Sequence, residues 1–579
     1  MPEGTTCGFL LVPERRDVPN SRTIKVAYAV HRSTAHDRRP DPVVYSSGGP
    51  GSRSLQLTGM LSAMFPERDV VVIDQRGGRD SEPRLECPEV VQGIVATLQT
   101  PGPSDRETAP VIRGALECQA RLEREHVDLR GYRTAEIAAD VVDLRKALGY
   151  ASWDLFGVSY STRSMLQAAA RDPQGSRTVV LDSFLPAGRK WYDEAVPSLA
   201  SSVAKLGITK RFGEMVARLD AHPATFVTRD PLTRKRITLQ LNGGDVATIL
   251  EEALHETDVI PLVPALVDAL ADGNTALLQP FVDEAGGGLT SHDWGLYYAV
   301  QCQDEAPFNS FPGGKGLRLF TGVADEAVCG AWKLPAARGG ESDSFPPGAT
   351  TPASAAFSSA SGSGRTAAGA LPVLVMGGQY DPTTPPEAAR DAARSLPDAR
   401  FTEFAGIGHA VFLSSECGRR TIAVWLDDPT SAAPPCDPAK PPYPIVRPGD
   451  RILTSSVYKV LSSPVLGAPG AAFVVVSLVQ LLGGLIALLR RRRGLLTAAA
   501  GLAGLLLAGL TALTLSGVSN QTELAIGLPR PLAWYGLLAL VSTALSTTEA
   551  FRLRSRAVHI IPAIAGLAFI AWLYGWLLA

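Results

Sequence analysis

Ser159 lies in the stretch of this 579-residue sequence with the clearest chemical signal, Asp-Leu-Phe-Gly-Val-Ser-Tyr-Ser at 154–161. A short apolar run ends at Gly157 and a helix is expected from about Tyr160, so the serine would lie on a tight strand-to-helix turn. Such a turn exposes a serine hydroxyl, which can then act as a nucleophile. Ser161 stands where the G-x-S-x-G pattern has its last glycine, and this departure weakens the match. An ordinary strand–helix turn is the alternative interpretation.

A nucleophilic serine needs a base to take its proton, and the base needs a carboxylate to orient it. Asp381 lies in a loop that follows the apolar run Val373–Met376. His409 follows a strand-like run and a Gly-x-Gly bend, and of the eight histidines it alone has such a place. The chain order serine, aspartate, histidine is that of α/β-hydrolases. We therefore predict that Ser159, Asp381 and His409 form a catalytic triad, although each alone could be an ordinary loop or surface residue.

A glycine-rich loop is predicted to assist this triad. Residues 43–51 read Val-Val-Tyr-Ser-Ser-Gly-Gly-Pro-Gly, a strand that runs into a loop. Backbone N–H groups of such a loop can be aimed at the negative charge that develops on a substrate oxygen. We predict that the backbone near Gly49 and the N–H of Tyr160 form this oxyanion hole. A plain turn is the alternative. The chemistry calls for neither a metal ion nor an organic cofactor.

The elements that must position these residues alternate between strands and helices. Residues 24–30 alternate as a half-buried strand does, and several short apolar runs read as buried strands. A helix is expected over 134–148, with Thr134 as its cap and Gly149 as its end. Residues 186–340 instead read as a helical insertion. The sequence predicts an α/β-hydrolase fold, a mostly parallel sheet flanked by helices, with a helical cap.

The predicted division of the chain into domains follows from these patterns and from the amino-acid composition. Residues 341–370 are rich in Ser, Gly, Ala and Pro and are expected to form a flexible loop. The parts are a first core segment at 1–185, a helical cap and flexible loop at 186–370, a second core segment at 371–440, a linker at 441–468 and four transmembrane helices at 469–579.

The C-terminal region is apolar enough to cross a membrane. Each predicted span is long enough for about 30 Å of hydrocarbon. Arginine clusters lie between the first and second spans and between the third and fourth, and the positive-inside rule places both in the cytoplasm. The region 1–465 would then face outside, with the helices as an anchor in the cell membrane. The predicted spans are 469–489, 494–515, 531–549 and 558–578.

Seven cysteines precede the apolar region, and none has metal-ligand spacing. Pairing between sequence neighbours in an oxidising compartment would give Cys87–Cys118, Cys302–Cys329 and Cys417–Cys436, and would leave Cys7 unpaired. Scattered free thiols are the alternative. No signal peptide is visible, so an exported domain implies a start upstream or a missing leader. The net charge of −2 provides no field that would attract nucleic acid.

Several stretches match a known family together. They are Cys7–Glu14, SSGGPG at 46–51, DQRG at 74–77 with Ser81, GVSYST at 157–162, YDPTTP at 380–385 and GIGHAVF at 406–412, with Cys417 and Cys436. In these the chain resembles the proline iminopeptidase and tripeptidyl aminopeptidase group of α/β-hydrolases, over roughly residues 7–437. Two departures are Ser161 and the Gly-Arg-Asp that follows DQRG, and neither removes a catalytic atom. The apolar C-terminal region is not part of the family's pattern.

The resemblance implies a serine peptidase that releases N-terminal residues or short peptides from substrates with a free N-terminus. Carboxylates of the helical cap would bind the substrate amine, and Asp304 and Glu305 are the residues predicted to do so. A solvated turn is the alternative for this pair. For the whole chain, the alternatives are a carboxylesterase or lipase acting on membrane-proximal esters and a catalytically inactive binding protein with a hydrolase fold. The oligomeric state stays open.

Overall fold

The computed structural model describes residues 1–100, 108–311, 316–337, 371–430, 436–490, 494–552 and 557–579. The flexible loop predicted at 341–370 lies outside them. The chain forms two compact units. One comprises Met1–Ile260 with Phe281–Pro442, and the other comprises Pro261–Pro280 with Tyr443–Ala579.

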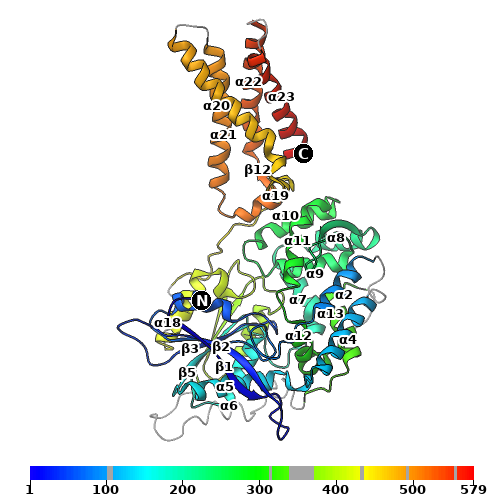
Figure 1. Cartoon of the computed structure of the whole chain (residues 1–579), viewed down its shortest axis with the longest axis vertical. Coiled ribbons are helices and arrows are strands. Elements are labelled where there is room, and N and C mark those ends of the chain that lie inside the picture. Colours follow the sequence, from blue (N-terminus) through cyan, green and yellow to red (C-terminus); the bar gives the residue numbers. More distant parts are fainter. Residues whose placement is uncertain (101–107, 312–315, 338–370, 431–435, 491–493, 553–556) are drawn as a thin grey trace. The chain divides into compact units, whose positions relative to one another are not determined.

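A sheet of eight strands forms the centre of the first unit (Figure 1). Its strands are β1 (Thr5–Pro13), β2 (Thr23–His31), β3 (Val43–Ser46), β4 (Val70–Ile73), β5 (Trp153–Val158), β6 (Ser176–Asp182), β9 (Val373–Gly378) and β10 (Ala399–Phe404). The order is β1-β2-β4-β3-β5-β6-β9-β10, and β1 and β2 are antiparallel to their neighbours. All the other pairs are parallel. The predicted mostly parallel sheet is confirmed.

Alternate side chains of the strands enter two apolar cores, one on each face of the sheet. Val44 and Leu155 enter the core that is covered by helices α5 (Thr134–Leu148), α6 (Ser161–Arg171) and α16 (Pro386–Ala393). Their neighbours Val43 and Phe156 enter the core that is covered by α1 (Thr58–Met64) and α18 (Glu416–Asp427). Because both faces are covered, the central strands are apolar throughout and read as continuous runs in the sequence.

Helix α5 has the bounds predicted for it, and Gly149 ends it in the left-handed region with a φ of 75°. Thr134 is not its cap, because the N-cap residue is Arg133 and no side chain of that residue caps the helix. The free N–H of Thr134 instead donates to the carboxylate of Asp304 at 2.7 Å. A carboxylate suits this place, since the first N–H groups of a helix lack partners within it.

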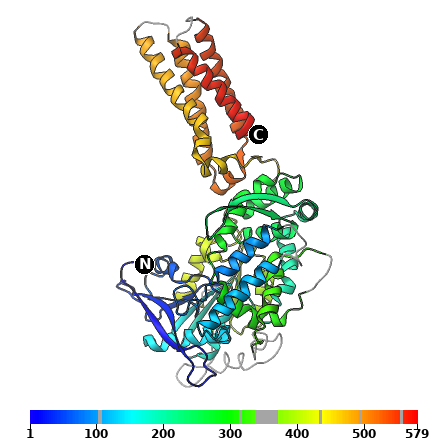
Figure 2. The ribbon, with the colours of Figure 1, turned by 45° about the vertical axis from the view of Figure 1, so that its right-hand side comes forward.

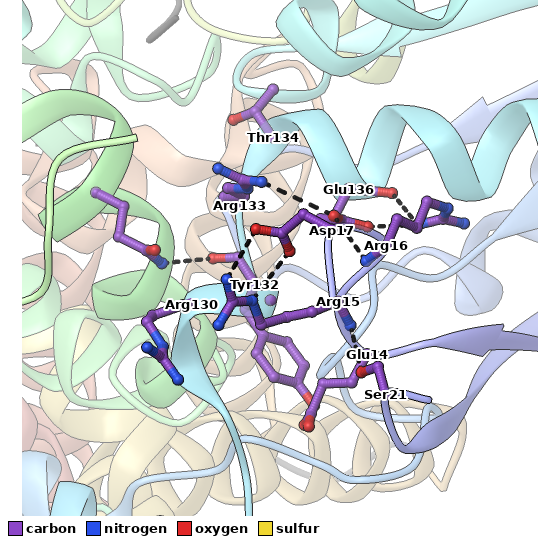
Figure 3. Close-up of polar contacts among 12 residues, drawn as sticks. Glu14, Arg15, Arg16, Asp17, Ser21, Arg130, Tyr132, Arg133, Thr134 and Glu136 are labelled. Atoms are coloured by element: carbon purple, nitrogen blue, oxygen red, sulfur yellow. Dashed lines mark hydrogen bonds and ion pairs between the residues drawn. The ribbon is translucent and has the colours of Figure 1, made fainter. Parts of the chain in front are cut away.

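Buried ion pairs tie the segment after β1 to α5 (Figure 3). Arg16 contacts Glu136 at 2.6 Å and Asp140 at 2.7 Å. Arg76, which is completely buried, binds both carboxylate oxygens of Asp140, at 2.7 and 2.6 Å. The arginine of the DQRG stretch is therefore a structural residue that joins the loop after β4 to α5.

A mainly helical region follows β6, as the sequence predicts, and a short β-hairpin is added to it. Its elements are α7 (Trp191–Lys205), α8 (Thr209–Ala221), β7 (Ala224–Arg229), β8 (Arg236–Leu241), α9 (Gly243–Ala253), α11 (Gln279–Gly288), α12 (Trp294–Val300) and α13 (Phe320–Trp332). Two earlier helices, α2 (Pro88–Leu98) and α4 (Ala109–Arg124), lie side by side (Figure 2), and α4 packs on α13. We call this region the cap.

All three predicted disulfides are confirmed. Cys87–Cys118 joins the start of α2 to α4, and Cys302–Cys329 joins the turn after α12 to α13. Cys417–Cys436 joins α18 to the segment that follows it. Cys7 is a free, exposed thiol on the edge strand β1.

The second unit is built from apolar helices. It contains α10 (Val263–Ala271), β11 (Arg451–Leu453), α19 (Ser456–Ser462), α20 (Ala468–Leu489), α21 (Leu495–Ser516), β12 (Gly527–Pro529), α22 (Pro531–Arg552) and α23 (Ala557–Trp572). The segment predicted as a linker, 441–468, thus holds a short strand and a short helix.

Three helices, and not the four that the sequence predicts, are long and apolar enough to cross a membrane in the described part of this region. They cover Pro464–Leu489, Leu495–Ser516 and Ile560–Leu577. Helix α22, which holds the remaining predicted span, is less apolar because it carries serines and threonines. Several of them are buried against neighbouring helices: the Ser542 hydroxyl donates to the carbonyl oxygen of Ala500 at 2.9 Å.

Candidate active site

Ser159 lies on the turn between β5 and α6 and has a positive φ of 56°. This conformation is uncommon for a residue with a Cβ atom and persists only where the surroundings hold it. Here the N–H of Ser159 donates to the carbonyl oxygen of Asp182, and the N–H of Thr162 donates to the carbonyl oxygen of Ser159, both at 3.0 Å. The turn is thereby held on both sides, and Ser159 lines a cavity.

Ser161, the departure from the expected glycine, has a structural explanation. It is completely buried, and its hydroxyl accepts the N–H of Val158 at 2.8 Å and lies 2.7 Å from the carbonyl oxygen of Ser46. The side chain therefore ties the turn to β3. Gly48, in contrast, must be a glycine, because a Cβ atom there would lie 2.7 Å from the Cβ of Ser159.

Asp381 and His409 are hydrogen-bonded to each other across the loops after β9 and β10. The Nδ1 of His409 lies 2.7 Å from Oδ2 of Asp381. Asp381 is completely buried and also accepts from the N–H and the hydroxyl of Thr384, at 2.8 and 2.6 Å. Burial alone would raise the pKa of Asp381, but His409 and these donors hold it well below its usual value. Ser159 and His409 line the same cavity.

A second imidazole, that of His255, lies beside His409. The ring centroids are 4.8 Å apart with an angle of 34° between the planes. The Nε2 of His255 lies 2.7 Å from the hydroxyl of Thr383, and its Nδ1 lies 3.3 Å from Glu252. Burial alone would lower the pKa of His255, but the charge of Glu252 outweighs burial and raises that pKa to about 9. Sequence reasoning missed His255. The signal for it was an acidic residue, Glu252, three positions before a histidine near the end of a helix.

Gln75, in the DQRG stretch, holds the glycine-rich loop in place. Its side-chain Nε2 donates to the carbonyl oxygens of Ser47 and Gly48, at 2.7 and 3.0 Å. Its Oε1 accepts the N–H of Gly51 at 2.9 Å. Gly49, predicted in the oxyanion hole, lines the cavity within this loop, and Tyr160 precedes the first residue of α6.

The cavity has a volume of about 780 Å³ and is lined from both the sheet and the cap. Aromatic residues form much of its cap side: Trp191, Tyr192, Trp294 and Tyr297. The hydroxyls of Tyr192 and Tyr297 both donate to the buried Asp325, at 2.8 and 2.6 Å, which fixes their orientation. The charged residues in its wall include Arg53, Glu251, Glu252 and Glu256.

Asp304 and Glu305, predicted to bind the substrate amine, do not line this cavity. Both are buried and already have protein partners. Asp304 binds the start of α5, and Glu305 contacts Arg163 at 2.6 Å and accepts the N–H of Trp191 at 2.9 Å. The structure thus does not bring this pair into the cavity that holds Ser159, and their role in binding the substrate amine stays a prediction. The acidic residues of the cavity come from the end of α9 instead.

Comparisons with known proteins agree with this architecture. The model of the family described as "alpha/beta hydrolase fold" matches residues 41–225, and that described as "TAP-like protein" matches 350–436. Serine protease Hip1 of Mycobacterium tuberculosis is 25% identical over 74% of this chain and 86% of its own. Tripeptidyl aminopeptidase of Streptomyces lividans is 24% identical over 52% of this chain and 61% of its own. Carboxylesterase B of M. tuberculosis is 26% identical over 73% of this chain and 84% of its own. The structure of proline iminopeptidase from Mycobacterium smegmatis is similar over 72% of this chain and 98% of its own, at 15% identity and a TM-score of 0.37.

The sheet order, the strand-to-helix turn at Ser159 and the family models define an α/β-hydrolase. Within that class, residues 350–436 match the TAP-like family and the relatives include serine hydrolases of that kind, and the chain carries apolar C-terminal helices in addition.

Proposed function

We propose that this chain is a membrane-anchored serine peptidase that works outside the cytoplasm and releases N-terminal residues or short peptides. The observation that carries the proposal is Glu251, an unpaired carboxyl in the wall of the cavity that also holds Ser159 and His409. A buried carboxyl without a partner favours a cationic ligand. A free N-terminus is the cation that every peptide can offer. Relatives named as a serine protease and a tripeptidyl aminopeptidase support this class of substrate.

Glu251 is only 7% exposed, and burial raises its pKa to about 8. No hydrogen bond or ion pair reaches its carboxyl group from the described residues. A substrate ammonium would supply the missing partner and restore the charge of the carboxylate. Glu252 and Glu256 add negative charge to the same wall, although Glu252 is also paired with His255.

The proposed mechanism uses Ser159, Asp381 and His409 as the triad. The Nδ1 of His409 is bonded to Asp381, which leaves Nε2 to take the proton of Ser159 as its hydroxyl attacks the substrate carbonyl. The negative oxygen would be received by the backbone N–H groups near Gly49 and of Tyr160. His409 then protonates the leaving amine, and a water molecule releases the acyl group from Ser159.

The proposed location rests on the apolar helices and the disulfides. Three helices long enough to cross a membrane fit a bilayer anchor. Three disulfides in the first unit fit an oxidising compartment, on the outer side of the membrane.

A carboxylesterase is the second candidate, because one relative that is 26% identical over 73% of this chain bears that name. The chemistry at Ser159 would be the same. An ester substrate has no ammonium group, however, so an esterase would have no use for the Glu251 carboxyl in the cavity wall.

The test is a comparison of substrates on the purified full chain in detergent. A tripeptidyl coumarin amide with a free N-terminus is compared with its N-acetylated form and with a p-nitrophenyl ester. We expect the free amine to be preferred by about tenfold or more, the order of one charge-assisted hydrogen bond. Ser159→Ala should remove the activity, and Glu251→Gln should raise KM for the free amine.

Glu214→Gln, an exposed change on α8, is the matched control for Glu251→Gln. Cleavage of the ester alone would transfer the assignment to the esterase. Cleavage of both amides at equal rates would refute the role of Glu251 while leaving a peptidase.

A further inference from the structure

Arg53 is a second charged residue in the cavity wall without a partner. Its side-chain Nε is buried and makes no hydrogen bond, and its guanidinium forms no ion pair with any described residue. The backbone of Arg53 is held, because the Ser47 hydroxyl donates to its carbonyl oxygen at 3.0 Å. The Nε is withdrawn from water without a hydrogen bond, and a buried donor is normally paired, so this position suits a negatively charged ligand.

Arg53 lies close in the sequence to the loop that contacts the nucleophile, Ser159. It follows the glycine-rich loop, whose Gly48 lies directly against Ser159. The acidic residues Glu251 and Glu252 come from a different element, α9. No acidic side chain of the described residues contacts Arg53, so its positive charge in the cavity wall is not neutralised by a neighbour.

We propose that Arg53 binds a carboxylate on the departing part of the substrate, so that the enzyme selects short peptides whose leaving fragment carries a free carboxylate. The inference rests on the proposed peptidase function. With the N-terminus held by Glu251, the departing fragment lies on the other side of the bond that Ser159 attacks. In a peptide without acidic side chains, the C-terminal carboxylate is the only negative charge, and it belongs to that fragment.

A guanidinium is the side chain best suited to this task. Its planar donors match the two oxygens of a carboxylate, and it stays charged at any physiological pH. The cavity volume of about 780 Å³ leaves room for a short peptide on both sides of Ser159. A long polypeptide would place its C-terminus far from Arg53 and would lose this contact.

The test uses two substrates that differ in one group. A tripeptide with a free N-terminus is joined to 4-aminobenzoate in one substrate and to the neutral 4-aminobenzamide in the other. The full-length enzyme is assayed in detergent, and the ratio of the two kcat/KM values is measured. We expect the wild type to favour the aminobenzoate by about tenfold at low salt, and the ratio to fall as ionic strength rises.

Variants assign the preference to Arg53. Arg53→Gln should bring the ratio close to one, and Arg53→Lys should retain part of it because it keeps the charge. Arg394→Gln, which removes an exposed arginine of the same unit, should retain the wild-type ratio. Since each ratio compares two substrates on one preparation, partial loss of active enzyme does not change it.

The outcomes separate this inference from the proposed function. Equal rates on the two substrates in the wild type would overturn the inference alone, as would a preference that Arg53→Gln preserves. A wild type that hydrolyses neither substrate would overturn the proposed function and this inference with it. Should Arg53→Gln fail to fold, judged by its thermal unfolding, the ratio of Arg53→Lys and the salt dependence decide.

Discussion

Ionisation of Glu251 opposes folding of the protein when no substrate is bound. Its pKa is about 8 in the folded state because it is buried, against 4.5 for an exposed glutamate. Between these pH values the folded protein keeps a proton that the unfolded chain releases. The stability that this residue contributes is therefore complete below about pH 4.5 and is lost as the pH rises toward 8.

We predict that Glu251→Gln increases the melting temperature relative to wild type by more at pH 8 than at pH 5. The glutamine has the same shape but does not ionise. Thermal unfolding of the full chain in detergent at the two pH values measures the difference, with Glu214→Gln as a control on the surface. An equal effect of Glu251→Gln at both pH values would mean that the carboxyl is not desolvated in the folded protein.

Single residues could be predicted from the sequence where a local pattern places them. Ser159 follows a strand and precedes a helix, and Asp381 and His409 each follow a strand, so the topology of the sheet brings them to one edge. Asp304 and Glu305 could not be placed in this way, because Thr134 and Arg163, which bind them, lie more than a hundred positions away in the chain. Glu251 escaped notice because the residues that line the cavity with it come from distant parts of the chain.

Among the elements, the glycine-rich loop depends on a side chain from outside it. Gln75 accepts one hydrogen bond from the loop and donates two to it. We predict that Gln75→Glu lowers kcat by about ten- to a hundredfold with a small change in KM, since loss of a well-placed oxyanion donor costs about that much or more. The carboxylate cannot donate to the two carbonyl oxygens and would repel them.

Steady-state kinetics on the free-amine substrate measure this effect, and the exposed Gln174→Glu is the matched control. A large rise in KM with an unchanged kcat would place Gln75 in substrate binding rather than in loop positioning.

The cap has its own covalent restraint in Cys302–Cys329, which closes a loop of 27 residues. We predict that the double change to serine destabilises the protein by about 3.5 kcal/mol, the value expected for a loop of this length. Chemical unfolding measures the loss. Cys7→Ser, which removes an exposed free thiol, should have no such effect, and equal destabilisation by both changes would contradict the prediction.

Elements with a regular pattern were predictable, and elements shaped by distant packing were not. Helix α5 has the predicted bounds because its apolar face and its terminal glycine are local signals. The hairpin of β7 and β8 lies inside the region predicted as a helical insertion, and its two strands form a separate small sheet.

For the whole molecule, the orientation in the membrane can be tested with the one free thiol. Six cysteines are in disulfides, so Cys7 is the only one of the seven that can react with a maleimide. We predict that a membrane-impermeant maleimide labels Cys7 in intact cells. In the variant Cys7→Ser with Ser555→Cys, the new thiol lies in the arginine-rich stretch expected in the cytoplasm, so it should react only after lysis. The reverse pattern would place the catalytic unit inside.

The serine-rich side of α22 has a consequence for how the chain enters a bilayer during synthesis. Alone in lipid, this helix would leave the Ser542 hydroxyl without its acceptor, the carbonyl oxygen of Ala500 in α21. Helices α20 and α21 are synthesised earlier, so they can already be in the membrane and form the surface on which α22 packs. We therefore expect a chain that lacks α21 to insert α22 into the membrane less efficiently than the full chain does.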